Sequence, residues 1–477
     1  MTAILGGHQT DFARNIAKQD QDVGDLTREA VEATLADAGI DATDVESIHV
    51  GNAFGQLYNG QGHLGAMPAT VVPDLWGVPA MRHEAACASS SMATLAAMAE
   101  IEAGRYDCVL VLGIEQEKNM PGAQAAAVQT AAAWVGHETE GVEFFWPYAF
   151  NRVADEYDRR YGIDETHLRA IGELNLRNAQ NNPNAQTRMW NLTPESFGDD
   201  DHANPVVEGR LRRNDVTQIT DGAAGVVLVS DRWLAERGLT ARARIAGWGH
   251  RTVGLPIDQK FERNSDSAYV MPHVRQAITD AFARAGIGGT DDLDAIETHD
   301  CMTPSEYLAI DHFGITAPGE SWKAVEEGRL ERDGDMPVNP SGGLIGGGHP
   351  VGATGARMLV DSMKQVTDTA DGYQVEGADR VATLNIGGST ATTVTLHGGP
   401  IAGAALIDTV GVVEGRCPAR QVGAGAEPSS CAGDDHCPDV VVGVGVIECG
   451  HQLSTHPLTH GIELVGPVES DRGDPLG

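Results

Sequence analysis

The chain contains a weak copy of itself, and this internal repeat constrains its fold more than any other feature. Residues 26–52 and residues 274–300 share one pattern: an amphipathic helix closed by Ala-Gly-Ile, an acidic turn, and a short strand that ends at a polar residue. A second pair agrees, because residues 87–113 and residues 348–388 each place a helical run before a buried strand. Repeated strand-helix-strand units predict a duplicated α/β domain with mostly parallel, buried strands.

The composition changes between the two copies and again after them. Residues 115–215 or so are rich in Asn, Gln, Trp and Tyr, which indicates an inserted loop domain over a ligand site, with a purely structural lobe as the alternative. We therefore expect an N-terminal half over residues 1–235, including this loop domain, and a C-terminal half over residues 236–400. Residues 401–477 are mostly Gly, Ala, Val, Pro and Asp, and we expect them to form a disordered tail outside the core.

Charge and hydropathy exclude several classes of partner and location. The formal net charge of −35 argues against nucleic acid or an anionic membrane as the main partner. No segment approaches the roughly 20 apolar residues that span a bilayer, and the N-terminal residues lack the plan of a secretory signal, so we expect a cytoplasmic protein. Only five of the 33 basic residues are lysine, which with the acidic excess is typical of a halophilic protein. An acidic mesophilic protein is the alternative.

Seven cysteines are scattered along the chain, and their odd number and wide spacing predict reduced thiols rather than a disulfide framework. Several of them fall in the tail together with two histidines, but their spacing lacks the pair separated by two to four residues on which structural zinc sites are built. We expect no zinc site there, with a folded metal module as the alternative. The tail residues weighed are Cys417, Cys431, His436, Cys437, Cys449 and His451.

Cys87 lies in the segment HEAACASSSMATL, where an extended stretch is predicted to meet a helix. A thiol at a helix N-terminus faces free backbone N–H groups and the positive end of the helix dipole, which favours a nucleophilic thiolate. The small residues that follow leave room for a substrate. An inert, small core residue is the alternative for an isolated cysteine among alanines.

His349 lies in a loop with seven glycines in fourteen residues, GGLIGGGHPVGATG. Such a density of glycine predicts tight turns or a close ligand, and a histidine there can serve as a base or as a donor to an oxyanion. A phosphate cradle is the competing interpretation. The spacing fits neither GxxxxGK[ST] nor a GxGxxG turn after a strand.

His299 and Cys301 stand two residues apart at the end of the strand predicted in the second copy. Residues two apart in an extended strand project to the same face, so both side chains are expected in one pocket. The pair could be part of a metal site, but no nearby residues have zinc-ligand spacing, so we expect no metal.

In this combination and order, the motifs resemble those of the thiolase family. The segment around Cys87, the HDC segment at residues 299–301, the GGGHPVGATG loop and the NIGGST turn at residues 385–390 follow one another as in thiolases, and the resemblance covers about residues 1–400. It is closest to the archaeal and sterol-carrier-type branch, here with a haloarchaeal composition. The resemblance implies a duplicated five-layer α-β-α-β-α thiolase-like fold with an inserted loop domain.

Two positions depart from ordinary thiolases. An HDCM segment that ends at Met302 stands where those enzymes have NEAF, and Asn385 stands where they have a second catalytic cysteine. The resemblance therefore implies that Cys301 takes over the work of that cysteine. Met302 also replaces the aromatic residue of the commoner HDCF, which is expected to alter the preference for the acyl chain.

The resemblance further implies a role for each site residue. His349 would activate Cys87, which takes the acyl group from an acyl-CoA, and Cys301 would remove the α-proton of acetyl-CoA or return it during thiolysis. His299 and His349 would hold the enolate oxygen, while backbone N–H groups at Cys87 and near Gly388 would hold the oxyanion of the acylation step. This chemistry uses coenzyme A thioesters as substrates and needs no cofactor.

The implied function is that of an acyl-CoA C-acyltransferase, in condensation or thiolysis, with short chains modestly favoured. The alternative is a non-catalytic thiolase-like scaffold subunit of a CoA-metabolising complex, which the presence of Cys87, Cys301 and His349 disfavours. A homodimer or homotetramer is expected. Archaeal thiolases of this kind associate with a hydroxymethylglutaryl-CoA synthase through a small zinc-ribbon and OB-fold protein, so these are candidate partners.

Overall fold

The computed structural model describes residues 2–399, 440–441 and 446–447. The chain divides into two compact units, Met1–Ala404 and Ala405–Gly477. Of the second unit only the short antiparallel strands β12 (Val440–Val441) and β13 (Val446–Ile447) are described. The predictions made for residues 401–477, disorder and the absence of zinc, therefore lie outside the described residues.

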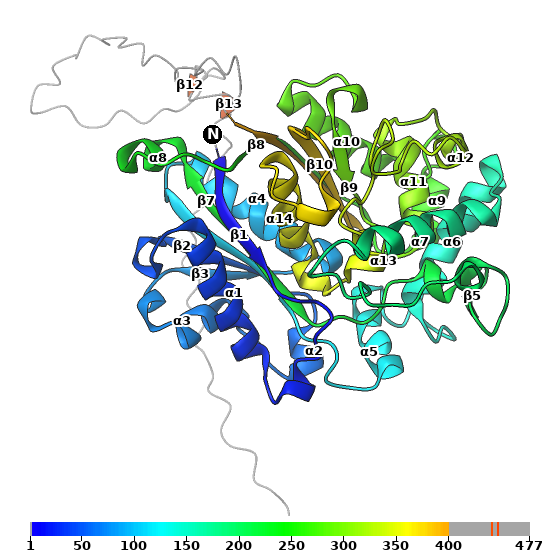
Figure 1. The fold of residues 1–477 in the computed structure, drawn as a ribbon, viewed down its shortest axis with the longest axis horizontal. Helices are drawn as coiled ribbons and strands as arrows, with labels where there is room; N and C mark the ends of the chain where they lie inside the picture. The colour runs from blue at the N-terminus through cyan, green and yellow to red at the C-terminus, as the bar shows by residue number, and fades with distance from the viewer. Residues whose placement is uncertain (1, 400–439, 442–445, 448–477) are drawn as a thin grey trace, which may run out of the picture. The chain divides into compact units, whose positions relative to one another are not determined.

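The first unit is built on a nine-stranded mixed sheet with the strand order β3-β2-β4-β7-β1-β8-β11-β10-β9 (Figure 1). Its strands are β1 (Thr2–Gln9), β2 (Ser47–Gly51), β3 (Ala80–His83), β4 (Cys108–Glu115), β7 (Gly222–Ser230), β8 (Ala243–Thr252), β9 (Ala295–Glu297), β10 (Arg380–Gly387) and β11 (Thr390–Gly398). A separate hairpin pairs β5 (Val206–Glu208) with β6 (Leu211–Arg212).

Helices connect and cover these strands. They are α1 (Val23–Ala38), α2 (Gly55–Asn59), α3 (Met67–Val71), α4 (Ser89–Glu102), α5 (Gly122–Val128), α6 (Phe145–Tyr161), α7 (Glu165–Ala179), α8 (Asp231–Arg237), α9 (Ile257–Arg263), α10 (Pro272–Ala285), α11 (Thr303–Phe313), α12 (Ser321–Glu326), α13 (Gly343–Gly347) and α14 (Thr354–Val366). No helix in the described part of the chain is long and apolar enough to cross a membrane.

The sequence repeat reappears as a repeated structure. Helix α1 leads to β2 and helix α10 leads to β9, and each helix ends at a glycine in the left-handed conformation, Gly39 with φ 69° and Gly286 with φ 68°. Each of these glycines donates its N–H to carbonyls of the last helical turn, a helix end that needs a residue without a Cβ. Helix α4 with β4 and helix α14 with β10 form the second repeated pair, as the sequence predicts.

The expectation of mostly parallel strands is wrong. Three strand pairs of the large sheet are parallel, namely β2–β3, β2–β4 and β9–β10, and the other five are antiparallel. The repeated helix-strand units do supply the parallel pairs, but β1, β7, β8 and β11 add antiparallel ones. The clearest case is the two-residue turn Gly388–Ser389 between β10 and β11, which is too short for a parallel crossover.

The layers follow from which side chains share a hydrophobic core. In β4, Val109 and Val111 pack in the cluster that contains α4 and α14, whereas Leu110 and Leu112 pack in the cluster that contains α1. Strands β1 and β8 pair at only two positions, so the sheet has two halves, and α14 contacts strands of both. Helix α10 packs on β8 and β11 of the second half. This gives the five-layer α-β-α-β-α order, with α4 and α14 side by side in the middle (Figure 1).

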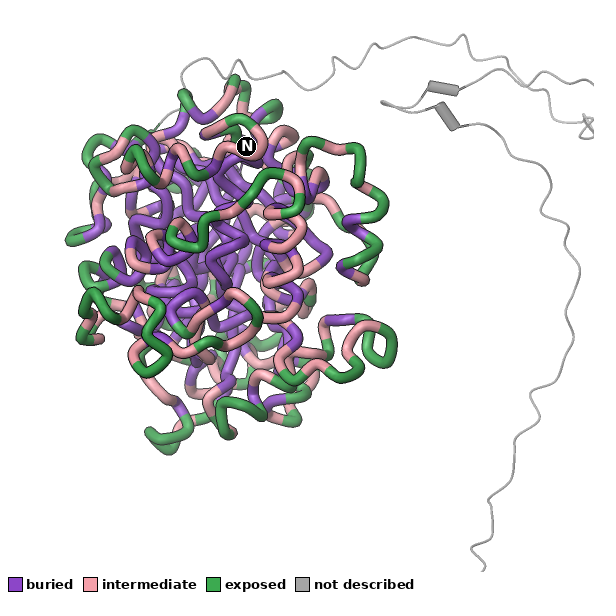
Figure 2. The backbone as a smooth tube through the Cα atoms, turned by 90° about the vertical axis from the view of Figure 1, so that its right-hand side faces the viewer, coloured by how far each residue is buried: buried purple, intermediate pink, exposed green. Residues whose placement is uncertain are grey.

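The segment between β4 and β7 carries α5, α6 and α7. Helix α6 packs on α11, and α7 packs on both α11 and α13, so this segment lies against the connections that follow β9. Buried backbone runs through the middle of the described unit while exposed residues concentrate in peripheral loops and helix ends (Figure 2). The segment between β4 and β7 therefore covers the strand ends and loops that carry the HDC and GGGHPVGATG motifs.

Candidate active site

Cys87 lies in a tight turn between β3 and α4. The 3₁₀ turn Ala86–Ala88 precedes α4, and Ala86 has a φ of 47°, a left-handed conformation that is strained for a residue with a Cβ. Two side chains hold the turn: Glu84 accepts a hydrogen bond from the Ala86 N–H at 2.6 Å, and Ser89 accepts one from the Ala85 N–H at 3.0 Å. The Cys87 thiol is thus fixed one turn before the helix, near the predicted place.

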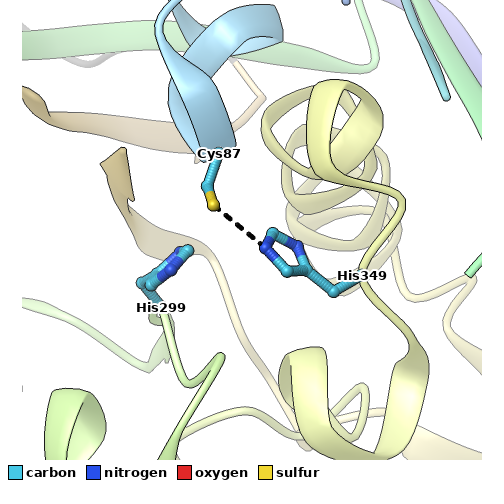
Figure 3. A group of neighbouring side chains, drawn as sticks. All are labelled: Cys87, His299 and His349. Carbon is cyan, nitrogen blue, oxygen red and sulfur yellow. Dashed lines mark hydrogen bonds between the residues drawn. The ribbon is translucent and has the colours of Figure 1, made fainter. Parts of the chain in front are cut away.

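Cys87 and His349 form a hydrogen-bonded pair, although 262 residues separate them in the chain. The Cys87 Sγ lies 3.1 Å from the His349 Nε2 (Figure 3). The other ring nitrogen, Nδ1, lies 2.6 Å from the Thr354 Oγ1, whose hydroxyl donates to the Pro350 carbonyl at 3.1 Å. Because that hydroxyl proton is used, Thr354 accepts from the Nδ1–H, and the lone pair of Nε2 points at the thiol.

His299 completes the cluster from the other side. One side-chain atom each of Cys87, His299 and His349 lies within 4.8 Å of the other two, and the two imidazole rings stand nearly perpendicular, with centroids 5.5 Å apart (Figure 3). His299 is fully buried, and neither of its ring nitrogens has a hydrogen-bond partner among the described residues. An unpartnered buried donor beside a nucleophile is suited to hold an oxygen that a substrate brings.

The turn between β10 and β11 packs directly against the Cys87 loop. A Cβ on Gly387 would lie 2.0 Å from the Ala85 carbonyl oxygen, and a Cβ on Gly388 would lie 2.7 Å from the Trp146 ring, so both positions require glycine. Gly388 also has a φ of 67°. The backbone N–H of Gly388 has no acceptor among the described residues, and that of Cys87 faces its own thiol, so both are placed where an oxyanion on a thioester at Cys87 would form.

Comparison with known proteins assigns the chain to a family. Residues 2–232 match the family model "Thiolase, N-terminal domain", and residues 258–397 match the model "Thiolase C-terminal domain-like". The chain belongs to the thiolase family. The sequence-based identification and the predicted fold class are therefore confirmed.

Relatives of this thiolase include the archaeal and sterol-carrier-type proteins that its motifs resemble. The acetyl-CoA acetyltransferase of Methanothermobacter thermautotrophicus is 32% identical over 405 residues, which cover 83% of this chain and 98% of the relative. Sterol carrier protein 2 of Bos taurus is 28% identical over 403 residues, covering 83% and 71%. Among solved structures, the Ltp2-ChsH2(DUF35) aldolase aligns with a TM-score of 0.66 and 21% identity, over 83% of this chain and 97% of that chain.

The Cys87 thiol has a raised pKa, contrary to the expectation of a thiolate stabilised at a helix N-terminus. Burial and the carboxylate of Glu117 raise the pKa of Cys87 above its ordinary value. Burial, His299 and Arg357 lower the pKa of His349 well below its usual range. Both shifts favour the uncharged forms, the thiol of Cys87 and the neutral imidazole of His349.

Glu115, the last residue of β4, and Glu117, two residues beyond it, are buried beside the loop that follows His349. Glu117 accepts a hydrogen bond from the Val351 N–H at 2.9 Å, and Glu115 accepts one from the Gly352 N–H at 3.0 Å. Burial raises the pKa of Glu115 to about 7 and that of Glu117 well above its ordinary value. The two carboxyl groups therefore bind the loop that follows His349 and position the histidine, a role that sequence reasoning missed.

Cys301 lies close to the site but not in the cluster of three. Strand β9 ends at Glu297, so the expected placement of His299 and Cys301 within a strand is wrong, and the pair lies in the connection to α11. Cys301 is buried, and burial, Cys87 and Asp300 raise the pKa of its thiol well above the ordinary value. The electrostatic influence of Cys87 indicates that the two sulfurs are near one another.

Asp300 explains why the histidine loop is rich in glycine. Its carboxylate accepts hydrogen bonds from the Leu344 N–H at 2.6 Å and the Ile345 N–H at 3.1 Å, at the start of α13. A Cβ on Gly343 would lie 2.4 Å from the Asp300 Oδ2. Asp300 therefore joins the HDC segment to the glycine-rich loop. Asp300 and Thr354 lie inside sequence motifs, whereas Glu117 lies in none, so the sequence carried no signal of its contacts.

One cavity borders His349 of the cluster, and a second lies beside the Gly388 turn. The first is lined by His349 and Met302 together with residues of the α5–α6 segment such as Phe145 and Trp146. Met302, which the sequence singled out as a departure from the family pattern, is therefore a wall residue beside the imidazole. The second cavity borders Gly388 and shares Phe145 and Trp146 with the first.

Proposed function

We propose that this thiolase is an acyl-CoA C-acyltransferase that works through an acyl-enzyme on Cys87, by condensation of an acyl-CoA with acetyl-CoA or by the reverse thiolysis. The observation that carries the proposal is the 3.1 Å contact between the Cys87 Sγ and a His349 whose tautomer leaves Nε2 as the acceptor. A thiol without this base would stay protonated at its raised pKa.

In the first half-reaction, the Cys87 sulfur attacks the acyl carbonyl carbon while its proton moves to the His349 Nε2. The free N–H groups of Cys87 and Gly388 hold the oxyanion that forms. Collapse of the tetrahedral intermediate breaks the bond from the acyl carbon to the coenzyme A sulfur. The leaving thiolate takes its proton from Cys301, so Cys301 becomes a thiolate beside the protonated His349.

In the second half-reaction, the Cys301 thiolate removes the α-proton of acetyl-CoA. Acylation is compatible with this step, because Cys87 as a thioester cannot form the thiolate that would raise the pKa of Cys301. The enolate oxygen is held by His299, whose ring nitrogens have no other partner in the described structure, and by His349, which can donate from Nε2 because it is now protonated. The enolate carbon attacks the thioester, Cys87 leaves, and the protons on Cys301 and His349 restore the resting state.

The geometry indicates the reaction more directly than it indicates which acyl group is transferred. Short chains remain modestly favoured, and the acyl group would extend into the cavity that Met302, His349 and Trp146 line. The alternative, a non-catalytic scaffold subunit, would not need a base with a fixed tautomer or an unpartnered His299. The complete cluster supports the enzyme over the scaffold.

The test uses the whole chain with acetyl-CoA and with acetoacetyl-CoA plus coenzyme A, at high and low salt. We expect intact-protein mass spectrometry to show one acetyl adduct on Cys87 and thiolysis to proceed in the spectrophotometric assay. A chain that binds coenzyme A thioesters but forms no adduct would favour the scaffold. An adduct that forms without any condensation or thiolysis would point to a different fate of the acyl-enzyme.

We further propose that the enzyme works in an assembly. The Ltp2-ChsH2(DUF35) aldolase, by its name, joins a chain of this fold with a DUF35 protein, which supports a DUF35 partner here. A homodimer or homotetramer, a hydroxymethylglutaryl-CoA synthase and a zinc-ribbon/OB-fold protein are the other proposed members. Affinity purification of the tagged chain from its native cells, followed by mass photometry, tests these proposals.

A further inference from the structure

Cys87, His299 and His349 form a possible ligand set for a metal ion as well as the centre of a thiol-dependent reaction. One side-chain atom of each lies within 4.8 Å of the other two, and both imidazole rings point toward the Cys87 sulfur (Figure 3). One thiolate and two imidazoles are ligands that Zn²⁺ and its chemical relatives Co²⁺ and Cd²⁺ prefer. Three protein ligands leave the fourth tetrahedral position open to water.

The distances within the cluster are close to those of a tetrahedral zinc site. Bonds of about 2.3 Å to sulfur and about 2.0 Å to nitrogen place a ligand sulfur and a ligand nitrogen about 3.6 Å apart. The Cys87 Sγ and the His349 Nε2 lie 3.1 Å apart. The pair would have to open by about half an ångström to admit the ion, which is a shift that side-chain rotation supplies.

The hydrogen bonds of the two histidines leave lone pairs for a cation. The His349 Nδ1–H donates to the Thr354 Oγ1 at 2.6 Å, which directs the lone pair of Nε2 toward Cys87. Metal-bound histidines are usually held in this way, with the second ring nitrogen donating to an oxygen. His299 is fully buried, and neither of its ring nitrogens has a partner among the described residues. A bound cation would satisfy one of these unpartnered nitrogens.

The surroundings of the cluster let an ion enter and do not strongly repel it. His349 lines a cavity of about 320 Å³, which has room for a hydrated ion, and Cys87 is partly exposed. The positive charge nearby belongs to Arg357. Its guanidinium lies 2.8 Å from a carboxylate oxygen of Glu297 and 3.2 Å from one of Asp361, and these two ion pairs offset its charge.

We propose that the resting enzyme binds one cation of the Zn²⁺ class through Cys87, His299 and His349, and that the bound cation blocks acylation. As the metal–sulfur bond forms, the thiol proton passes to solvent, and neither the sulfur nor the His349 base is then available for attack on a thioester. The acyl-enzyme is protected, because a thioester sulfur is a poor metal ligand.

The site is therefore inhibitory, active enzyme carries no cation at these residues, and the inference goes beyond the proposed acyltransferase function. The expectation of no metal at His299 and Cys301 rested on spacing along the chain. Such spacing does not test ligands that come from three distant segments, since 262 residues separate Cys87 from His349.

The experiment titrates the metal-free, full-length chain with Co²⁺ and then with Zn²⁺. We expect cobalt to give a thiolate-to-metal charge-transfer band together with the visible bands of a tetrahedral site, and zinc to displace it. The burst of coenzyme A released from acetyl-CoA should fall in proportion to the zinc bound, and EDTA should restore it. Prior acetylation of Cys87 should prevent the cobalt spectrum from forming.

Variants of the chain assign the ligands. Cys87→Ala should lose the charge-transfer band of this site, and His299→Gln should bind cobalt at least about tenfold more weakly. Cys108→Ala is the matched control, because Cys108 is a buried cysteine outside the cluster, and its cobalt spectrum should be unchanged. The cysteines of the tail are present in every variant, so any band from them cancels in the difference spectra. Thermal unfolding shows whether each variant is folded.

The outcomes separate this inference from the proposed function. A cobalt spectrum that is the same in Cys87→Ala as in the unmodified chain would place the ion elsewhere, and the inference would be wrong. It would also be wrong if the coenzyme A burst stayed complete in a large excess of zinc. Failure of the metal-free enzyme to acetylate Cys87 would instead refute the acyl-enzyme, while the cobalt spectra would still decide whether the cluster binds metal.

Discussion

Thr354 fixes the tautomer of His349, and its removal is the most direct test of how Cys87 is activated. The substitution Thr354→Val replaces the hydroxyl by a methyl group of similar volume at the first position of α14, so it leaves no cavity. The His349 Nδ1–H, now 2.6 Å from the Thr354 Oγ1, would lose its acceptor in a fully buried place. The tautomer with the proton on Nε2 would then compete, and that form cannot accept the Cys87 proton.

The magnitude follows from the cost of an unsatisfied buried donor, about 1–3 kcal/mol. Because 1.36 kcal/mol is tenfold in rate, acylation should slow about 5- to 150-fold. The assay is the burst of coenzyme A released when enzyme and acetyl-CoA are mixed in a stopped-flow instrument, with the adduct confirmed by mass spectrometry. Binding of acetyl-CoA should change little, because Thr354 contacts His349 and the backbone.

Thr354→Ser is the matched control, since it keeps the hydroxyl and should acylate at nearly the original rate. A folded Thr354→Val enzyme with an unchanged burst would refute the reasoning, because the tautomer of His349 would then not depend on Thr354. Slowing in both variants to the same degree would show that the methyl group of Thr354, rather than its hydroxyl, matters for packing.

Four other predictions concern the nucleophile, the second thiol, the surface and the tail. Cys87→Ala should abolish both the acyl adduct and turnover, and an adduct on Cys301 in the unmodified enzyme would overturn the assignment. Cys301→Ser should leave acylation of Cys87 largely intact but nearly stop condensation, whereas an equal loss of both half-reactions would make Cys301 a structural residue. With a net charge of −35, unfolding temperature and activity should rise together from dilute to molar KCl, and equal values in both would contradict the halophilic interpretation. Truncation after Gly399 should leave soluble, active enzyme without bound zinc, as measured by thiolysis and by zinc analysis of the full-length chain.

The sequence predicted the elements that recur and missed the way they pair. Gly39 and Gly286 mark equivalent helix ends, which is a local property, so the repeat could be read directly from the residues. Whether two neighbouring strands run parallel or antiparallel depends on how the chain connects them, and the hydropathy pattern does not show those connections. The sequence predicts that the turn at Gly388 lies near a bound oxyanion. Its two-residue length also makes β10 and β11 antiparallel.

Site residues were predictable where a motif carried them and not where contacts between distant segments set their role. Cys87, His299 and His349 lie together as the resemblance implied, although 262 residues separate the first from the last. Thr354 lies inside the GATG motif, but only its hydrogen bond to the imidazole reveals its role.

The sequence predicts a thiolate at Cys87, whereas the structure favours a neutral thiol there. A helix N-terminus alone would favour a thiolate, but Glu117 lies nearby and burial removes the water that would stabilise the anion. A permanently charged Cys87 would oppose ionisation of Cys301, and both thiols must act in one cycle. Holding Cys87 neutral until His349 accepts its proton, and then converting it into a thioester, makes the two ionisations successive. The burial that raises the pKa of Cys87 therefore also keeps its ionisation separate from that of Cys301.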